Sequence, residues 1–357
     1  MHTTKNSSTR TMSLDIIRGV ALLGMLIVHA AGFSKAGLNL SIHSLDHYLS
    51  IFNTLFFDNK FVSIFAFLFG VGSQMFFLRA QQRELRSYQL FSRRLITLLP
   101  IGIISMLIAP QVTPILVMYS LLGFILVPFF KLKPRIILRI AGILASCNMI
   151  LMIGTMVFVT ADNSILPMIM HFIYYILLIV SMFLLGLYVG KIDLFKQLSQ
   201  HMSKIKRIHK ISLFLSLPFV LAGVWAGYIN PNINENIFFL GIGDLASYPF
   251  LIFYLSSMLI LYHKNYFSFM YKPLSYVGRI SLTAYVGHLL LLKLLIALLG
   301  WTHGYTLVQS LVLVFIVYTI LIIFSFVWMQ KFQQGPLEKV WRLFTYGKSI
   351  KKLSSYK

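Results

Sequence analysis

Apolar stretches of about 18 residues or more recur along the whole 357-residue chain, and they constrain its fold more than any other feature. A helix of that length matches the hydrocarbon thickness of a bilayer. Charged residues make up only 11% of the chain, and the mean hydropathy is +0.81, which excludes an ordinary soluble domain. The sequence therefore predicts an all-α, polytopic membrane helix bundle.

Ten such stretches indicate about ten transmembrane helices. They cover approximately residues 13–33, 61–79, 94–110, 112–130, 137–159, 166–189, 211–229, 245–263, 279–299 and 306–329. Only residues 109–111 separate the third from the fourth, which predicts a tight hairpin. The stretch 38–57 is less apolar and mixed in pattern, so we expect a helix that lies at the outer interface or re-enters it.

The net charge of +22 predicts the orientation of the chain. If the amino terminus is cytoplasmic and each span reverses direction, six basic clusters that hold 27 of the 31 Lys and Arg residues fall on one side. These clusters cover residues 5–10, 79–94, 131–139, 191–210, 264–279 and 331–357. This is the positive-inside pattern, so we expect both termini to be cytoplasmic and the basic loops to meet anionic lipid. The charge is poor evidence for nucleic-acid binding.

No soluble domain or long linker interrupts the apolar pattern, so residues 1–357 are predicted to form a single integral-membrane domain that ends in a basic cytoplasmic tail, residues 331–357. The lone Cys147 excludes a disulfide within the chain. His43 and His47 have the spacing of two helical metal ligands, but two histidines alone are a weak signal. We therefore expect no metal centre and no permanently bound cofactor, and the sequence indicates no oligomeric state.

The first apolar stretch, "SLDIIRGVALLGMLIVHAAGF", carries three polar side chains that are costly in a membrane. Arg18 and His29 are eleven residues apart, or about three helical turns plus roughly 20°, so they share a face about 16 Å apart along the axis. Asp15 precedes Arg18 by three residues and can pair with its guanidinium. We expect this stripe to face protein, although a structural polar pair that only orients the helix is the alternative.

The ninth stretch carries a second group of candidates. Arg279 stands at its cytoplasmic start and could meet a phosphate, while Tyr285 and His288 are neighbours on one helical face. His288 could complete a site with His29 or position an acceptor, and interhelical hydrogen bonding is the alternative. Lys60, just before the second stretch, could line the outer mouth of such a site.

Four sequence stretches resemble the YeiB-like family of membrane proteins, which is related to the heparan-alpha-glucosaminide N-acetyltransferases. They are "SLDIIRGVALLGMLIVHAAGF" at 13–33, "KFVSIFAFLFGVGSQM" at 60–75, "VGRISLTAYVGHLL" at 277–290 and "FQQGPLEKVWRLFTYGK" at 332–348. The spacing of Arg18 and His29 also resembles the first span of the broader membrane acyltransferases, where ten residues separate an arginine from a histidine.

The resemblance implies an enzyme that moves an acyl group, such as acetyl, from cytoplasmic acyl-CoA to a hydroxyl or amine of a cell-envelope glycan or lipid-linked sugar. Arg18 and Arg279 would bind the phosphates of the co-substrate, acetyl-CoA. His29 would act as general base or become transiently acylated, with Arg18 beside it. In relatives the position of His29 is often asparagine and the catalytic histidine follows in the next outer segment, so His43 and His47 remain alternatives.

A transporter or flippase without covalent chemistry is the main rival, because intramembrane Asp15, Arg18 and His29 also suit a proton- or substrate-coupled path. The sequence shows no convincing internal repeat, which modestly favours the enzyme. A structural or regulatory membrane subunit is a third possibility. The resemblance places the protein in a bacterial plasma membrane.

Overall fold

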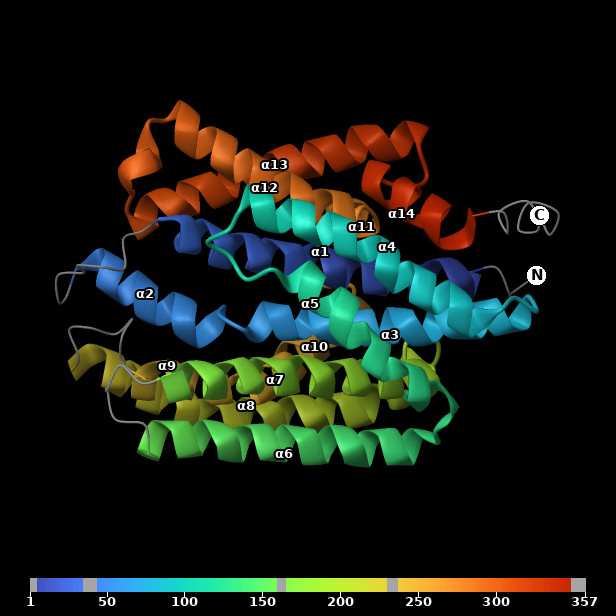
Figure 1. The fold of residues 1–357 in the computed structure, drawn as a ribbon, viewed down its shortest axis with the longest axis horizontal. Coiled ribbons are helices and arrows are strands. Elements are labelled where there is room, and N and C mark those ends of the chain that lie inside the picture. Colours follow the sequence, from blue (N-terminus) through green and yellow to red (C-terminus); the bar gives the residue numbers. More distant parts are fainter. Residues whose placement is uncertain (1–4, 35–43, 159–164, 230–236, 348–357) are drawn as a thin grey trace.

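The computed structural model describes residues 5–34, 44–158, 165–229 and 237–347, and within these ranges the fold is all-α, as the sequence predicts. Figure 1 shows the long helices side by side in a bundle, with α1 (Lys5–Phe33) near its middle. Helix α1 begins and α14 (Pro336–Tyr346) ends at the same end of the bundle. This arrangement agrees with an even number of crossings.

The other elements follow in chain order. They are α2 (Leu45–Phe56), α3 (Lys60–Gln82), α4 (Ser87–Ile108), α5 (Ile115–Leu122), the 3₁₀ helix η2 (Gly123–Lys131), α6 (Pro134–Phe158), α7 (Ile165–Lys191), α8 (Leu198–Ile229), α9 (Ile237–Leu245), α10 (Ser247–His263), α11 (Ser268–Arg279), α12 (Ser281–Leu298), the short 3₁₀ helix η3 (Trp301–His303) and α13 (Leu307–Lys331).

Nine helical stretches in the described ranges are long and apolar enough to cross a membrane. The predicted fourth span is the exception, because Ile115–Lys131 is a shorter apolar segment that changes from α-helix to 3₁₀ helix at Gly123. A 3₁₀ helix rises about 2.0 Å per residue against about 1.5 Å for an α-helix, so the two pieces together reach about 30 Å. The segment is thus long enough to match a bilayer core despite its small number of residues.

Two stretches are helices with a break, where the sequence predicted a different arrangement. The described part of the stretch 38–57 forms α2, which continues the line of α3 (Figure 1) instead of lying across the end of the bundle. The break falls at residues 57–59, where Asn59 has a left-handed φ of 58°. The predicted eighth span begins earlier than expected, at α9, and breaks at Ala246 before α10.

Glycines allow helices of the bundle to touch backbone to backbone. A Cβ at Gly70 of α3 would lie 2.1 Å from the carbonyl oxygen of Phe183, and a Cβ at Gly186 of α7 would lie 2.0 Å from that of Phe67. Only glycine fits such an approach, which is the usual way that membrane helices associate closely. In the same way, Gly19 of α1 and Gly278 of α11 lie against each other's helices.

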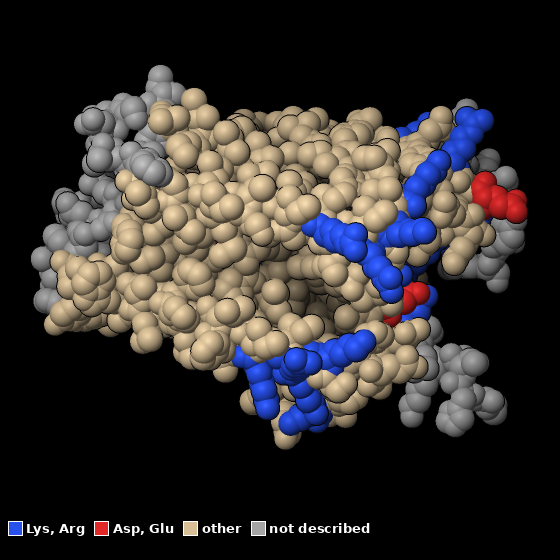
Figure 2. Space-filling view, turned by 90° about the horizontal axis from the view of Figure 1, so that it is seen from below, with Lys and Arg blue, Asp and Glu red and all other residues tan. Residues whose placement is uncertain are grey.

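One end of the bundle is rich in arginine, and we call it the basic end. It is the end where α3 turns into α4, and it carries Arg79, Arg83, Arg86, Arg93 and Arg94. Figure 2 shows one face of the molecule, on which Lys and Arg side chains lie at one end and reach the middle, while the other end carries none among the residues drawn in colour. This segregation is typical of a chain that crosses a membrane.

Candidate functional site

The polar stripe predicted on α1 faces protein. Asp15 is buried, and one of its carboxylate oxygens accepts a hydrogen bond from Nη1 of Arg18 at 3.0 Å, which confirms the predicted pair. The Arg18 side chain keeps 31% of its surface exposed. His29 lies further along the same helix and is only 3% exposed. The stripe therefore joins a half-open ion pair to a buried imidazole.

His29 contacts the second imidazole that the sequence singled out. Its Nδ1 lies 2.8 Å from Nε2 of His288 on α12, and the two rings stack with centroids 5.1 Å apart. Nδ1 of His288 lies 3.2 Å from the carbonyl oxygen of Ala284, which can only accept. In the neutral pair, His288 therefore carries its proton on Nδ1 and accepts at Nε2 from His29. This leaves Nε2 of His29 with a free lone pair, as a general base requires.

Tyr285 borders both imidazoles. Its ring lies edge-on to His29, with centroids 5.9 Å apart, and edge-on to His288, with centroids 5.2 Å apart. Tyr285 and His288 share one face of α12, as their spacing predicts. The sequence thus identified all three members of this aromatic cluster.

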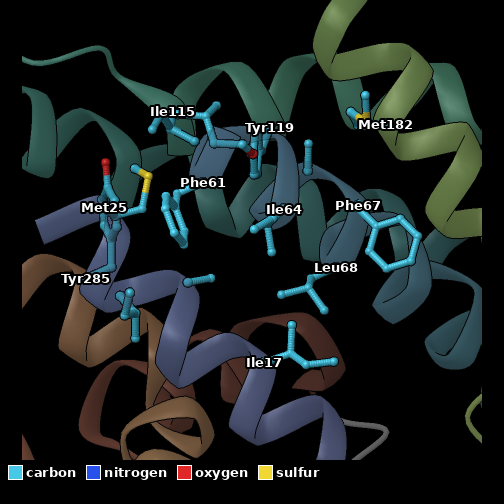
Figure 3. Packing of buried hydrophobic residues seen from close by; sticks show 14 of the residues in the cluster. Ile17, Met25, Phe61, Ile64, Phe67, Leu68, Ile115, Tyr119, Met182 and Tyr285 are labelled. Carbon is cyan, nitrogen blue, oxygen red and sulfur yellow. The ribbon is translucent and has the colours of Figure 1, made fainter. Parts of the chain in front are cut away.

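A cavity of about 370 Å³ begins at the basic end and runs along α1. Asp15 and Arg18 line it near the mouth, and Met25 and Tyr285 line its inner part. In Figure 3 Met25 and Tyr285 lie together, with Ile115 and Tyr119 across from them. The two histidines do not line the cavity, which stops about one helical turn before His29.

Four arginines line this cavity, namely Arg18, Arg79, Arg94 and Arg279. Sequence reasoning identified only the first and the last. The two carboxylates that line it are already engaged, since Asp15 pairs with Arg18 and Glu338 accepts hydrogen bonds from the start of α12. Within the described ranges no carboxylate forms an ion pair with the other three arginines. The cavity wall therefore carries an excess of positive charge, which favours an anionic ligand.

Glu338 positions the helix that carries His288. One carboxylate oxygen accepts hydrogen bonds from the backbone N–H groups of Leu282, at 2.6 Å, and Thr283, at 3.1 Å, and the other accepts from the Thr283 hydroxyl at 2.6 Å. A negative charge at a helix amino terminus is favourable. Burial raises the pKa of Glu338 above its ordinary value, although these hydrogen bonds oppose the change. Sequence reasoning missed this contact because it joins residues more than fifty positions apart.

Lys60 lies in a separate buried polar cluster. The side chain is completely buried, and its Nζ donates to the carbonyl oxygens of Thr54, at 2.7 Å, and Gly243, at 2.8 Å. These carbonyls belong to the broken helix pairs α2–α3 and α9–α10. Asp58 and Asp244 are the two carboxylates that interact electrostatically with Lys60. Lys60 therefore does not line an open outer mouth, as the sequence suggested, but holds the two breaks together.

Of the two alternative histidines, the structure describes only His47, which lies away from the His29 cluster. His43 lies outside the described residues. His47 is completely buried, and its Nε2 lies 3.1 Å from the carbonyl oxygen of Gly227 on α8. In the described part of the chain, His288 is thus the histidine that meets His29.

Comparison with known proteins gives a family and two bacterial relatives. Residues 189–348 match the model of the family described as "Protein of unknown function (DUF418)". The "Uncharacterized 39.9 kDa protein in amylase 3'region" of Bacillus acidopullulyticus is 29% identical over 96% of this chain and 95% of its own length. The "Uncharacterized protein YxaH" of Bacillus subtilis (strain 168) is 26% identical over 93% of each chain. No solved structure matches.

Proposed function

We propose that the protein transfers an acyl group from acyl-CoA to a cell-envelope hydroxyl or amine. The chain belongs to the DUF418 family of multi-pass membrane proteins, and the description of that family names no activity, so the proposal rests on the site. The observation that carries this proposal is the contact between His29 and His288, which orients the His29 ring. This contact lies just beyond the inner end of a cavity that is lined by arginines. An acyl-CoA combines a polyanionic head with an apolar arm. The positive mouth and the apolar interior of the cavity suit these two parts.

The reaction follows from the proton positions in the histidine pair. Nε2 of His29 takes the proton from the acceptor hydroxyl or amine while the acceptor oxygen or nitrogen attacks the thioester carbonyl carbon. The new C–O or C–N bond forms, the C–S bond breaks, and the leaving thiolate takes the proton back from the imidazolium. The products are the acylated acceptor and free CoA, and His29 returns to its starting form. Met25 and Tyr285 separate the cavity from the imidazoles, so they must move to admit the thioester.

The roles of the remaining residues follow from their places. Arg18 and Arg279 bind phosphate or the polarised thioester oxygen from the cavity wall, since a guanidinium matches such oxygens geometrically. Asp15 fixes the position of Arg18. Under this proposal the basic end faces the cytoplasm, both termini are cytoplasmic, and the protein lies in a bacterial plasma membrane that contains anionic lipid. The acceptor is a glycan or a lipid-linked sugar.

The experiment uses inside-out vesicles from a bacterial host that expresses the full chain, because such vesicles contain envelope precursors as acceptors. Labelled acetyl-CoA is added outside, and release of free CoA and transfer of label to lipid-linked material are measured. The wild type should do both, whereas Arg18→Gln should raise the KM for acetyl-CoA. Arg139→Gln, an exposed arginine on α6, is the matched control and should behave as the wild type. The absence of both activities in the wild type would refute the proposal.

Transport without covalent chemistry is a second candidate, and one observation favours it. The breaks of α2–α3 and α9–α10 meet around Lys60, together with Asp58 and Asp244. Broken helices that meet around buried charges are a feature of secondary transporters. In the same vesicles, flux of a labelled lipid-linked sugar that needs no acetyl-CoA and is abolished by Asp244→Asn would support this candidate over the enzyme.

A further inference from the structure

A second cavity of about 310 Å³ adjoins the first at the basic end. The two share five lining residues, which are Phe76, Arg79, Arg94, Trp341 and Tyr346. We call the cavity along α1 the inner chamber and the second cavity the outer chamber. The outer chamber adds Arg83 and Arg342 to the arginines of the shared wall. One extended ligand could therefore occupy both chambers.

Arg94 stands at the junction and is held there by aromatic rings. Its guanidinium carbon lies 4.8 Å from the ring centroid of Phe76 and 4.6 Å from that of Trp341. The indole N–H of Trp341 also donates to the backbone carbonyl of Arg94 at 2.8 Å. Contact with two rings restricts the movement of the guanidinium without occupying its N–H donors.

The Nε–H donor of Arg94 is unsatisfied within the described part of the chain. Its Nε is buried, and it has no hydrogen-bond acceptor among the described residues. A Cβ placed on Gly72 would lie 3.8 Å from Nη2 of Arg18 and 3.9 Å from Nη2 of Arg94, so the two guanidinium groups converge over Gly72. Two guanidinium groups this close repel each other, and the buried Nε–H of Arg94 lacks an acceptor. An anion bound between Arg18 and Arg94 would relieve both costs.

We propose that the outer chamber binds the phosphate-bearing head of a CoA-type co-substrate, with Arg94 as the central phosphate ligand and α14 as one wall. This inference rests on the proposed function for the identity of the ligand. Arg79, Arg83 and Arg342 surround the phosphates, and the arm of the ligand passes Arg94 into the inner chamber. The carboxyl-terminal helix is thereby part of the binding site, because it supplies Trp341, Arg342 and Tyr346.

The test measures binding of CoA itself, without an acyl group, to the purified full-length protein in neutral detergent by calorimetry. Arg94→Met should weaken CoA binding by about 10- to 100-fold, the loss expected for a charge-assisted hydrogen-bond pair. Arg94→Lys keeps the charge but loses the planar fork, so it should restore binding only in part. Arg139→Met is the control, and thermal unfolding of every variant reports whether it is folded.

Competitors identify the chemistry of the ligand. ADP and inorganic pyrophosphate should displace CoA from the wild type, whereas micelles of a neutral phospholipid should not. If anionic phospholipid binds through Arg94 and CoA does not, the site takes a lipid headgroup and the proposal is overturned. CoA binding that is unchanged in folded Arg94→Met also overturns it. If CoA binds through Arg94 but no acyl transfer is found, the phosphate site stands and the proposed function fails.

Discussion

Nδ1 of His29 and Nε2 of His288 lie 2.8 Å apart, although the two residues are 259 positions apart in the sequence. The contact joins the first helix of the chain to α12, and the i−4 hydrogen bond of His288 to Ala284 sets the direction in which its protons point. His288 is therefore a positioning residue. It holds the tautomer and the ring of His29 without touching the reacting atoms.

The first prediction concerns this positioning. His288→Phe keeps a flat ring but removes the acceptor for His29, so kcat for acetyl transfer should fall by about 10²- to 10⁴-fold while the KM for acetyl-CoA changes little. His288→Gln retains a side-chain oxygen that can accept from Nδ1 of His29 and should recover part of the rate. A purely structural role would instead lower the folded yield of both variants together, and a fluorescence-detected gel-filtration profile distinguishes the two outcomes.

The second prediction concerns the glycines between α3 and α7. Gly186→Ala places a Cβ 2.0 Å from the Phe67 carbonyl oxygen, so it should lower the free energy of unfolding by about 1–3 kcal/mol or more. Gly142→Ala is the matched control, because nothing lies within 4 Å of its Cβ. Since alanine is the better helix former, this control should be neutral or stabilise by about 0.5–1 kcal/mol. Equal thermal unfolding temperatures for the two variants would contradict the packing described here.

The third prediction concerns pH and Glu338. Burial raises the pKa of its carboxyl in the folded protein above the ordinary value of 4.5. The folded state therefore binds this proton more tightly than the unfolded state, and the resulting stabilisation is present below pH 4.5 and is lost as the pH rises through the raised pKa. Glu338→Gln cannot titrate. The free energy of unfolding of the wild type minus that of Glu338→Gln should accordingly increase as the pH falls. If this difference is the same at every pH between 4 and 8, the prediction is wrong.

The fourth prediction concerns Lys60. Lys60→Met removes the ammonium that satisfies two backbone carbonyls and leaves Asp244 without its nearby cation, so it should destabilise the fold by about 3–5 kcal/mol. The double variant Lys60→Met with Asp244→Asn should recover part of this loss, because one of the two carboxylates left without a cation, Asp58 and Asp244, is then neutral. Lys293→Met is the control, since that lysine is exposed and should cost little. Full stability of Lys60→Met would show that the helix breaks do not depend on Lys60.

Much of the fold could be predicted from the sequence because a bilayer imposes one length and one polarity on every crossing helix. The apolar stretches therefore located α6 and α7 to within three residues, and located the ends of α1 and α4 better than their starts. The polar residues 58–60 interrupt the apolar pattern, so the boundary between the stretches 38–57 and 61–79 was located from the sequence. The addition of α9 ahead of α10, and the contact of Lys60 with the Gly243 carbonyl, could not be predicted, because that contact joins residues 183 positions apart. Helices α11 and α14 were missed for a related reason: each is short and amphipathic, and its polar face looks like loop sequence.

The candidate site was predictable where the signal is an isolated polar residue in an apolar stretch. Asp15, Arg18, His29, Tyr285 and His288 stand out in this way, and Arg279 was identified because it stands at the cytoplasmic start of the same apolar stretch as Tyr285 and His288. Arg79 and Arg94 did not, because they belong to a basic cluster that the positive-inside rule already explains. What separates Arg94 from its neighbours is its contact with both Phe76 and Trp341, and only the packing of α14 against α4 reveals it.

The most direct measurement compares wild type and His29→Gln for release of free CoA from acetyl-CoA in inside-out vesicles, at equal amounts of folded protein. Glutamine keeps an N–H that can donate to His288 but has no basic nitrogen, so it should preserve the packing and remove the chemistry. The account predicts that acceptor-dependent CoA release falls to the background of vesicles without the protein, while CoA binding is retained. Release by His29→Gln at the wild-type rate would contradict it.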